Sequence, residues 1–489
     1  MRHKFQQQLT IGITPISEVK IPTKSRDELP PVLAALQHLF ITPGLNEKVF
    51  AILEAKIKAD KKETGRTGMD LWEILVLATV RMTLNTNYDR LHYLANFDKL
   101  LREIMGVENR LSEGKTYGLQ TLKDNVSLLD EETVNQINTL VVETAHHFVL
   151  KKNETLRIKS DTYVLETNVH FPTDLNLLWD SARKCIDTMN YCKKNYELKE
   201  WRKSSFWRSS LKSLVRSCGK ACASTSKNKQ TAIKSQVEEY LRLAKEIDAK
   251  VTISAAWLQA SPLLDWSLLC ILEELDYYQK MLKKHIDLVD RRLLRGEQIP
   301  TEEKIYSIFE PHTEWISKGK QNKKVELGHK ILIATDQNHF IIHQQVIEKQ
   351  ADVNLTIPLV DALLSKYKNR EIESLSLDKG FYSKENKELL SLEIPSVIMP
   401  KKGKPNKVEK EEESAKPFKK LRNAHSAVES NINQLEHNGL DRCPDKGIKG
   451  YKRYVSLGIL SYNLHRLGQV LQQKAREEIK ESKPHKQAA

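Results

Sequence analysis

Three acidic residues, Asp161, Asp378 and Glu429, stand in sequence settings that would hold a carboxylate in a fixed place. Asp161 and Asp378 each end a short alternation of apolar and polar residues, a pattern that predicts a strand with the Asp turned away from its buried face. Glu429 lies on a predicted helix, about a hundred degrees round from Val428 on the apolar stripe. Three carboxylates held in this way can share two Mg²⁺ ions about 3.5–4 Å apart, which activate an attacking oxygen and stabilise a leaving one.

A single Glu on an amphipathic helix is in most proteins a solvated surface residue. The interpretation of Glu429 as a site residue therefore depends on the two Asp residues upstream. Apolar residues on either side of Glu429, from Ala424 to Leu435, recur at helical spacing and predict one buried stripe. An acid at the edge of such a stripe would be rigidly positioned.

Five short segments occur in the order known from one protein family: residues 161–174 (DTYVLETNVHFPTD), 309–320 (FEPHTEWISKGK), 325–330 (VELGHK), 377–383 (LDKGFYS) and 428–431 (VESN). Together they resemble the motifs of DDE transposases of bacterial insertion sequences, and most of all the ISNCY-type group. Each motif alone is weak, but five in the same order are specific. The similarity extends from about residue 45 to residue 470. The resemblance implies that Asp161, Asp378 and Glu429 are the catalytic acids and the metal ligands.

The sequence departs from the related transposases around the third acid. Those proteins carry a Tyr-x2-Arg-x3-Glu-x6-Lys signature, and the flanking places here hold Arg422, His425 and Glu436. Arg422 can still contact a phosphate, whereas Glu436 cannot take the place of a Lys. The departure puts contacts to the DNA backbone in doubt at these places and leaves the predicted metal site unchanged.

The resemblance implies an α/β fold with an RNase H-like catalytic core, a mixed sheet with flanking helices. It implies a DNA transposase that cleaves at the terminal inverted repeats of an insertion sequence and joins the 3′-hydroxyl ends to target DNA. Its cofactor would be two Mg²⁺ ions, for which Mn²⁺ should substitute. Two alternatives stay open: an RNase H-like DNA nuclease that cuts without joining, and a non-catalytic DNA-binding protein derived from a transposase.

Composition favours a polyanionic partner. The chain of 489 residues has a net charge of +14 and a pI near 9.2, so double-stranded DNA is the leading candidate, although basic proteins without nucleic acid are common. No secretory segment and no apolar run long enough for a bilayer is found, which predicts a soluble, cytoplasmic and nucleoid-associated protein without a membrane partner. Six cysteines in so long a chain do not indicate a disulfide scaffold.

Changes in periodicity divide the chain into parts: a leader (1–45), a helical N-terminal domain (46–150), a catalytic domain in two segments (151–176 and 302–450), a helical insertion (177–301) and a C-terminal helix with its tail (451–489). The N-terminal domain either recognises the transposon end or serves as a support or dimerisation domain. Residues 401–420 are rich in charge and contain proline, which predicts a mobile loop near the site.

Basic residues interleaved with aromatic ones in the insertion predict contacts to the DNA backbone, with an ordinary solvated basic face as the alternative. The predicted DNA-binding residues are Lys203, Arg208, Lys212, Lys318, Lys320, Lys330, Lys379 and Arg422.

Two ends must be joined in one event, which predicts a homodimer on DNA. A leucine stripe over residues 457–471 could supply the contact between subunits or belong to the core, and the N-terminal helices are another candidate surface.

Overall fold

The structure is a computed structural model that describes residues 13–57, 68–108, 114–196, 198, 201–317, 324–404 and 406–481. The chain forms two compact units. Residues 1–168 and 316–489 form the first unit, and residues 169–315 form the second. Each unit has a hydrophobic core of its own.

The first unit is built on a mixed sheet with β1 (Leu156–Thr167) at its centre. On one side β1 is antiparallel to β3 (Val325–Thr335), which forms an antiparallel hairpin with β4 (Ile341–Ile347). Residues 331–334 of β3 are fully buried, as expected for an uninterrupted apolar run in a central strand. The turn over residues 336–340 joins the two strands of this hairpin.

On its other side β1 is parallel to β5 (Ile372–Leu377), which is parallel to β6 (Ser396–Ile398). Two short strands complete the sheet: β2 (Glu314–Ser317) beside β3, and β7 (Arg442–Cys443) parallel to the end of β1. The strand order on the main path is β2-β3-β1-β5-β6. Antiparallel and parallel neighbours thus meet at β1.

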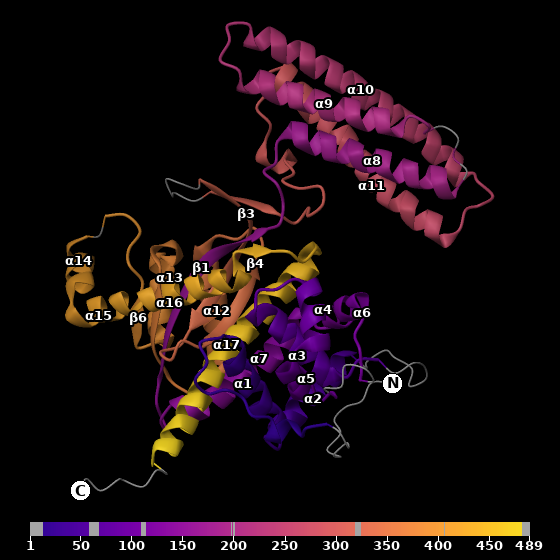
Figure 1. The fold of residues 1–489 in the computed structure, drawn as a ribbon. Helices are drawn as coiled ribbons and strands as arrows, with labels where there is room; N and C mark the ends of the chain where they lie inside the picture. Colours follow the sequence, from indigo (N-terminus) through magenta and orange to yellow (C-terminus); the bar gives the residue numbers. More distant parts are fainter. Residues whose placement is uncertain are drawn as a thin grey trace. The chain divides into compact units, whose positions relative to one another are not determined.

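The part before the sheet is helical, as predicted. Its helices are α1 (Leu29–Ile41), α2 (Leu45–Ile57), α3 (Leu71–Thr83), α4 (Tyr88–Phe97), α5 (Lys99–Met105), α6 (Leu119–Val126) and α7 (Glu131–Val149). All residues of α3 are buried. The long C-terminal helix α17 (Gly447–Glu481) packs on α1, α3 and α7, and Figure 1 shows it in yellow beside them. These helices and the sheet share one hydrophobic cluster.

The leucine stripe of α17 lies inside this cluster. Leu457, Leu460, Leu464 and Leu467 are fully buried by the rest of the same chain. The stripe is therefore core, and this part of it offers no surface to a second subunit. Among the described residues, no helix has both the length and the hydropathy needed to span a membrane.

The other α-helices of the first unit follow β4, β5 and β6 along the chain: α12 (Asp352–Lys366), α13 (Lys384–Glu393), α14 (Lys407–Ser414), α15 (Lys416–Ala424) and α16 (Ser426–Leu435). The prediction of a loop over residues 401–420 is wrong, because α14 and most of α15 fall there. Asn406 and Glu409 form a capping box at the start of α14, and Lys401 Nζ lies 2.7 Å from Glu409 Oε2. Two of the charged side chains that had suggested a loop thus form an ion pair with one another within this segment.

The second unit is helical, as predicted for the insertion. It contains α8 (Asp174–Asn195), α9 (Ser204–Ala223), α10 (Lys229–Gln259) and α11 (Trp266–Val289), which continues as a π-helix over Asp290–Leu294. Trp201 is fully buried in its core and donates its indole N–H to the Ser254 hydroxyl at 2.9 Å. Trp201, one of the aromatic residues interleaved with the basic residues of the insertion, is thus a core residue.

Candidate active site

The register of β1 and β5 brings the two predicted Asp residues together. Ser160 on β1 pairs with Leu377 on β5 in a parallel register, so the next residues, Asp161 and Asp378, lie side by side where β5 ends. Asp161 continues β1 and is partly buried, whereas Asp378 follows the last residue of β5 and is exposed. The strand predicted for Asp378 therefore ends one residue earlier, and its carboxylate is free to turn outwards.

The third acid comes from α16, which packs on β1. Val428 and Leu435 are fully buried, and Glu429 is exposed beside them, as predicted. The prediction of one continuous stripe is wrong at its start, because Ala424 is exposed. The helix is interrupted at His425, between α15 and α16, so that the two segments do not share one buried face.

The carboxylates act on one another electrostatically. The pKa of Asp161 is raised to about 6, chiefly by burial and also by the negative charges of Asp378, Glu429 and Asp352, while the backbone N–H of Thr162 opposes this shift. That N–H donates to Asp161 Oδ1 at 2.7 Å. The fold thus brings the three predicted acids into one electrostatic neighbourhood, and it adds a fourth acid to them.

Carboxylate oxygens are the ligands that Mg²⁺ prefers, so the types of donor fit this ion. Within the part of the chain that the structure describes, however, no group of three His, Cys, Asp or Glu side chains is arranged to hold a metal ion. The acids form an open cluster and not a closed coordination sphere. The donor chemistry fits a divalent metal, and the spacing would have to tighten when an ion binds.

Asp352, the fourth acid, had no signal in the sequence beyond its place at the start of α12. Its Oδ1 accepts from Lys330 Nζ at 2.9 Å, so Lys330, which we predicted to bind DNA, is engaged within the chain. A Cβ atom on Gly380 would lie 3.0 Å from Asp352 Oδ2. The Gly of the LDKGFYS segment therefore lets the residues after Asp378 approach Asp352 closely.

His425 joins the elements that carry two of the acids. Its Nδ1 lies 3.1 Å from the Ser376 hydroxyl on β5, two residues before Asp378. Burial lowers the pKa of His425, whereas the charges of Asp378 and Glu429 raise it, which places the imidazole near both acids. The resemblance placed an Arg at this position, and the structure gives the His that replaces it a contact within the site.

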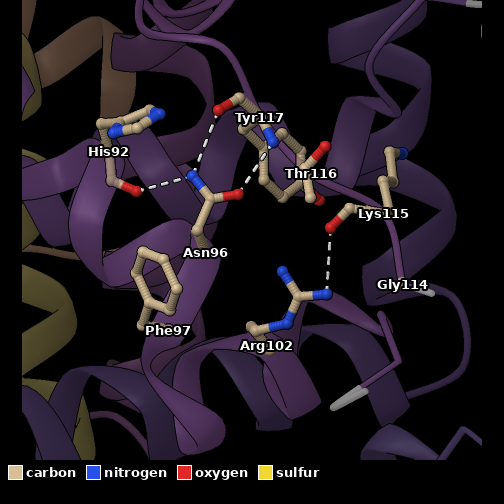
Figure 2. A pocket seen from close by; sticks show the side chains of 8 residues that line it. All are labelled: His92, Asn96, Phe97, Arg102, Gly114, Lys115, Thr116 and Tyr117. Atoms are coloured by element: carbon tan, nitrogen blue, oxygen red, sulfur yellow. Dashed lines mark hydrogen bonds between the residues drawn. The ribbon is translucent and has the colours of Figure 1, made fainter. Parts of the chain in front are cut away.

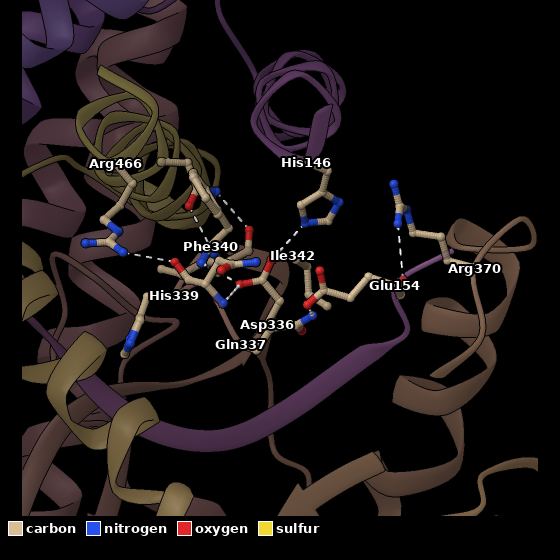
Figure 3. A network of polar contacts seen from close by, with 12 residues as sticks. His146, Glu154, Asp336, Gln337, His339, Phe340, Ile342, Arg370 and Arg466 are labelled. Atoms are coloured by element: carbon tan, nitrogen blue, oxygen red, sulfur yellow. Dashed lines mark hydrogen bonds and ion pairs between the residues drawn. The ribbon is translucent and has the colours of Figure 1, made fainter. Parts of the chain in front are cut away.

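A second polar network holds the middle of α16 in place. Asn431 is buried, and its Oδ1 lies 3.2 Å from His339 Nδ1 in the turn between β3 and β4, and 3.3 Å from the Tyr462 hydroxyl of α17. Figure 3 shows this turn, in which Asp336 accepts from the backbone N–H of Phe340 and contacts His146 at 2.7 Å. The VESN segment thus contains an exposed acid, Glu429, and a buried Asn431 that bonds to neighbouring elements.

The predicted DNA-binding residues are spread over several surfaces. Lys203, Lys212, Lys379 and Arg422 are exposed, and so is Arg208, whose Nη1 lies 2.8 Å from Asp187 Oδ1. Lys318 and Lys320 lie outside the described residues.

Four basic residues of α9 form a row that we had only partly predicted. Arg208, Lys212, Arg216 and Lys220 are all exposed and follow one another at steps of four, so they lie along one side of the helix. The helix contains no Asp or Glu. This basic row is a surface suited to a phosphate backbone.

A cavity in the N-terminal helices lies apart from the acids. Figure 2 shows it between α4, α5 and the segment before α6, lined by Asn96, Arg102 and Tyr117 among others. Asn96 exchanges two hydrogen bonds with the backbone of Tyr117, and Arg102 donates to the Lys115 carbonyl at 3.0 Å. These bonds fix the segment that leads into α6, so the cavity has a structural explanation.

The comparisons with known proteins agree with this geometry. Residues 286–464 match the family model described as "Transposase DDE domain". The matched segment contains Asp378 and Glu429, while Asp161 precedes it. Searches among curated proteins and among solved structures gave no match. The ISNCY-type group stays a prediction, whereas the broader resemblance to DDE transposases is confirmed by the match over residues 286–464.

Proposed function

We propose that this protein is a DNA transposase that cleaves at the terminal inverted repeats of an insertion sequence and joins the 3′-hydroxyl ends to target DNA. One observation carries the proposal. The β1–β5 register sets Asp161 beside Asp378, and the charges of Asp378 and Glu429 act on Asp161. The carboxylates belong to two neighbouring strands and a later helix, and they come together where β5 ends.

The sheet supports an RNase H-like catalytic core. Its three longest strands, β1, β3 and β4, are successive antiparallel neighbours, and β5 and β6 extend it in parallel on the other side of β1. The helical unit of residues 169–315 is inserted between β1 and β3 along the chain. The order of elements is therefore that of a catalytic core interrupted after its first strand.

In the proposed site, Asp161 and Asp378 would hold both metal ions, and Glu429 would complete the ligand shell of one. Two Mg²⁺ ions, or Mn²⁺ in their place, would neutralise the charge that develops on the phosphate and activate the attacking oxygen. Asp161 must be ionised to serve as a ligand, and because burial and the neighbouring acids raise its pKa, a metal ion would compete with a proton for this carboxylate as the pH falls. Lys330 holds Asp352, so that this fourth acid is paired within the chain.

The chain itself has little covalent chemistry to perform, because water and then a DNA 3′-hydroxyl are the nucleophiles. Its residues position the phosphodiester in line with each nucleophile. Lys379 and Arg422, exposed next to Asp378 and before α16, are suited to contact the phosphates around the cleaved bond. The basic row of α9 is suited to hold the DNA backbone at the second unit.

We further propose that the protein acts as a homodimer on DNA, in the bacterial cytoplasm at the nucleoid. Each chain has one set of three acids, and two ends must be processed in one event. The N-terminal helices remain the proposed reader of the terminal DNA.

An assay with two products tests the proposal. A duplex that carries the inverted repeats flanking the coding region is incubated with Mg²⁺ and a supercoiled target plasmid. We expect cut ends with free 3′-hydroxyls and covalently joined plasmid. Cut ends without joined plasmid would favour the nuclease alternative, and binding without either product would favour the non-catalytic DNA-binding protein.

A further inference from the structure

Large apolar side chains are exposed together at one end of the second unit. We call this set the apolar end: Ile253, Trp257, Leu263, Leu264, Trp266 and Leu269. Trp266 is 80% exposed and Ile253 is 68% exposed, values far above those of ordinary surface residues of their type. The six residues lie on the last turns of α10, in the turn that follows and on the first turns of α11 (Figure 1).

The six residues lie close together along the chain, on two helix ends and the turn that joins them. Ile253 and Trp257 are one turn apart on α10, and Trp266 and Leu269 are one turn apart on α11. Between the helices, the backbone N–H of Leu264 donates to the Ser261 carbonyl at 3.2 Å, which closes the turn. The exposure therefore belongs to an ordered turn and not to a frayed end.

The segment that carries the apolar end holds few charges of its own. From residue 251 to residue 272 the only charged side chain is Asp265, in a chain of which 29% of residues are charged. Asp265 Oδ1 accepts from the Leu268 N–H at 2.7 Å and caps α11. This segment itself therefore offers no Lys or Arg to a phosphate, although Trp201, whose indole N–H bonds Ser254, is followed by two basic residues.

We propose that the apolar end is the contact surface for a second copy of this chain. Two copies of one apolar surface can meet about a twofold axis, and its single carboxylate, on Asp265, already accepts a hydrogen bond from the Leu268 N–H. The six side chains expose roughly 600–700 Å², close to the ~800 Å² that each partner contributes to a standard interface. The alternative surface on α17 is not available, because Leu460 and Leu467 are buried within the chain.

Paired substitutions with a matched control test this proposal. Trp266→Lys with Leu269→Lys places two charges on the apolar end. Leu389→Lys with Leu392→Lys on α13 is the control, since these residues are also three apart on a helix and are 45% and 82% exposed, compared with 45% for Leu269 and 80% for Trp266. Sedimentation velocity over a range of protein concentrations gives the dimer dissociation constant, and circular dichroism checks the fold.

We expect the wild-type chain to dimerise and the Trp266/Leu269 variant to bind itself at least ~30-fold more weakly, which is the effect of losing one strong interface residue. The control should dimerise like wild type. A monomeric wild type, unchanged assembly of the variant, or an equal loss in the control would overturn the proposal. Intact assembly with lost DNA binding would assign the surface to DNA instead.

A second measurement uses the wild-type chain alone and does not depend on a folded variant. Cys270 is exposed and lies one turn after Trp266. Its reaction with a maleimide, followed by peptide mass analysis, should slow as the protein concentration rises and the apolar end is covered. A rate independent of protein concentration while the protein is dimeric would place the contact elsewhere.

Discussion

The Nδ1 atom of His425 lies 3.1 Å from the hydroxyl oxygen of Ser376, and this contact connects the start of the Glu429 helix to the strand that precedes Asp378. The two acids come from elements that are far apart in the sequence. A short contact between their supporting residues limits how far the carboxylates can move apart. Both positions are therefore expected to affect the reaction without contacting DNA.

Replacing His425 by Ala should slow single-turnover cleavage by at least ~10-fold while end-binding stays unchanged, because a positioning error acts on the chemical step. Ser376→Ala should have a smaller effect in the same direction. Ser430→Ala is the control, since that hydroxyl bonds only the Ser426 carbonyl on the exposed side of α16. Cleavage by His425→Ala at the rate of the control variant would show that the contact does not position the acids.

Asn431 is expected to anchor α16. Asn431→Ala leaves the His339 ring and the Tyr462 hydroxyl without this partner, and should lower the free energy of unfolding by about 1–3 kcal/mol. Asn433→Ala, at an exposed position on the same helix, should change it by less than ~0.5 kcal/mol. Urea unfolding of both variants compares the two sites, and equal values would contradict the anchoring role.

The raised pKa of Asp161 predicts a stability effect with a definite sign. Burial and the neighbouring acids raise this pKa to about 6, so the ionised carboxylate destabilises the folded metal-free protein above that pH. Asp161→Asn should therefore be more stable than wild type by about 1–3 kcal/mol at pH 7.5. The difference should shrink as the pH falls from about 6 towards 4, where the folded protein takes up the proton.

Magnesium should make the wild type more stable than Asp161→Asn, the reverse of the order expected without metal. Added Mg²⁺ binds the folded wild type and stabilises it at pH 7.5, whereas Asp161→Asn lacks one ligand and should gain little. Urea unfolding with and without Mg²⁺ measures both effects. A wild type that is more stable than Asp161→Asn without metal would contradict the proposed environment of Asp161.

The basic row of α9 should contribute to the salt dependence of DNA binding. Lys212, Arg216 and Lys220 changed together to Ala should flatten the log–log slope of affinity against salt by up to about 2.7, if each residue contacts one phosphate. Lys280, Lys283 and Lys284 on α11 serve as the control, with the same loss of charge. An equal change in slope for both triples would mean a general effect of net charge.

Local patterns were sufficient to predict several parts of the site. Alternation predicted β1 with Asp161, and helical spacing predicted the buried Val428 beside Glu429. The pairing of Ser160 with Leu377 could not be predicted, because register between distant strands depends on the whole sheet.

Other features depended on interactions that a local pattern does not contain. Asp352 approaches the site only because α12 begins where Gly380 leaves room. Charge density had predicted a loop over residues that form α14 and α15. There Glu412 of α14 pairs with Lys387 of α13 at 2.8 Å, a contact between elements that the local sequence does not reveal. The interruption at His425 exposed Ala424, although the spacing alone fitted a single helix.

Cleavage of terminal-repeat DNA by acid variants under two metals tests the central claim most directly. Asp378→Cys should be inactive with Mg²⁺ and should recover part of its activity with Mn²⁺, which accepts a sulfur ligand more readily. Asp161→Asn and Glu429→Gln should be inactive with either metal, whereas Glu436→Gln, on the π-helical turn after α16, should cleave like wild type. Cleavage at the wild-type rate by a variant of Asp161, Asp378 or Glu429 would contradict the assignment of that acid to the catalytic site.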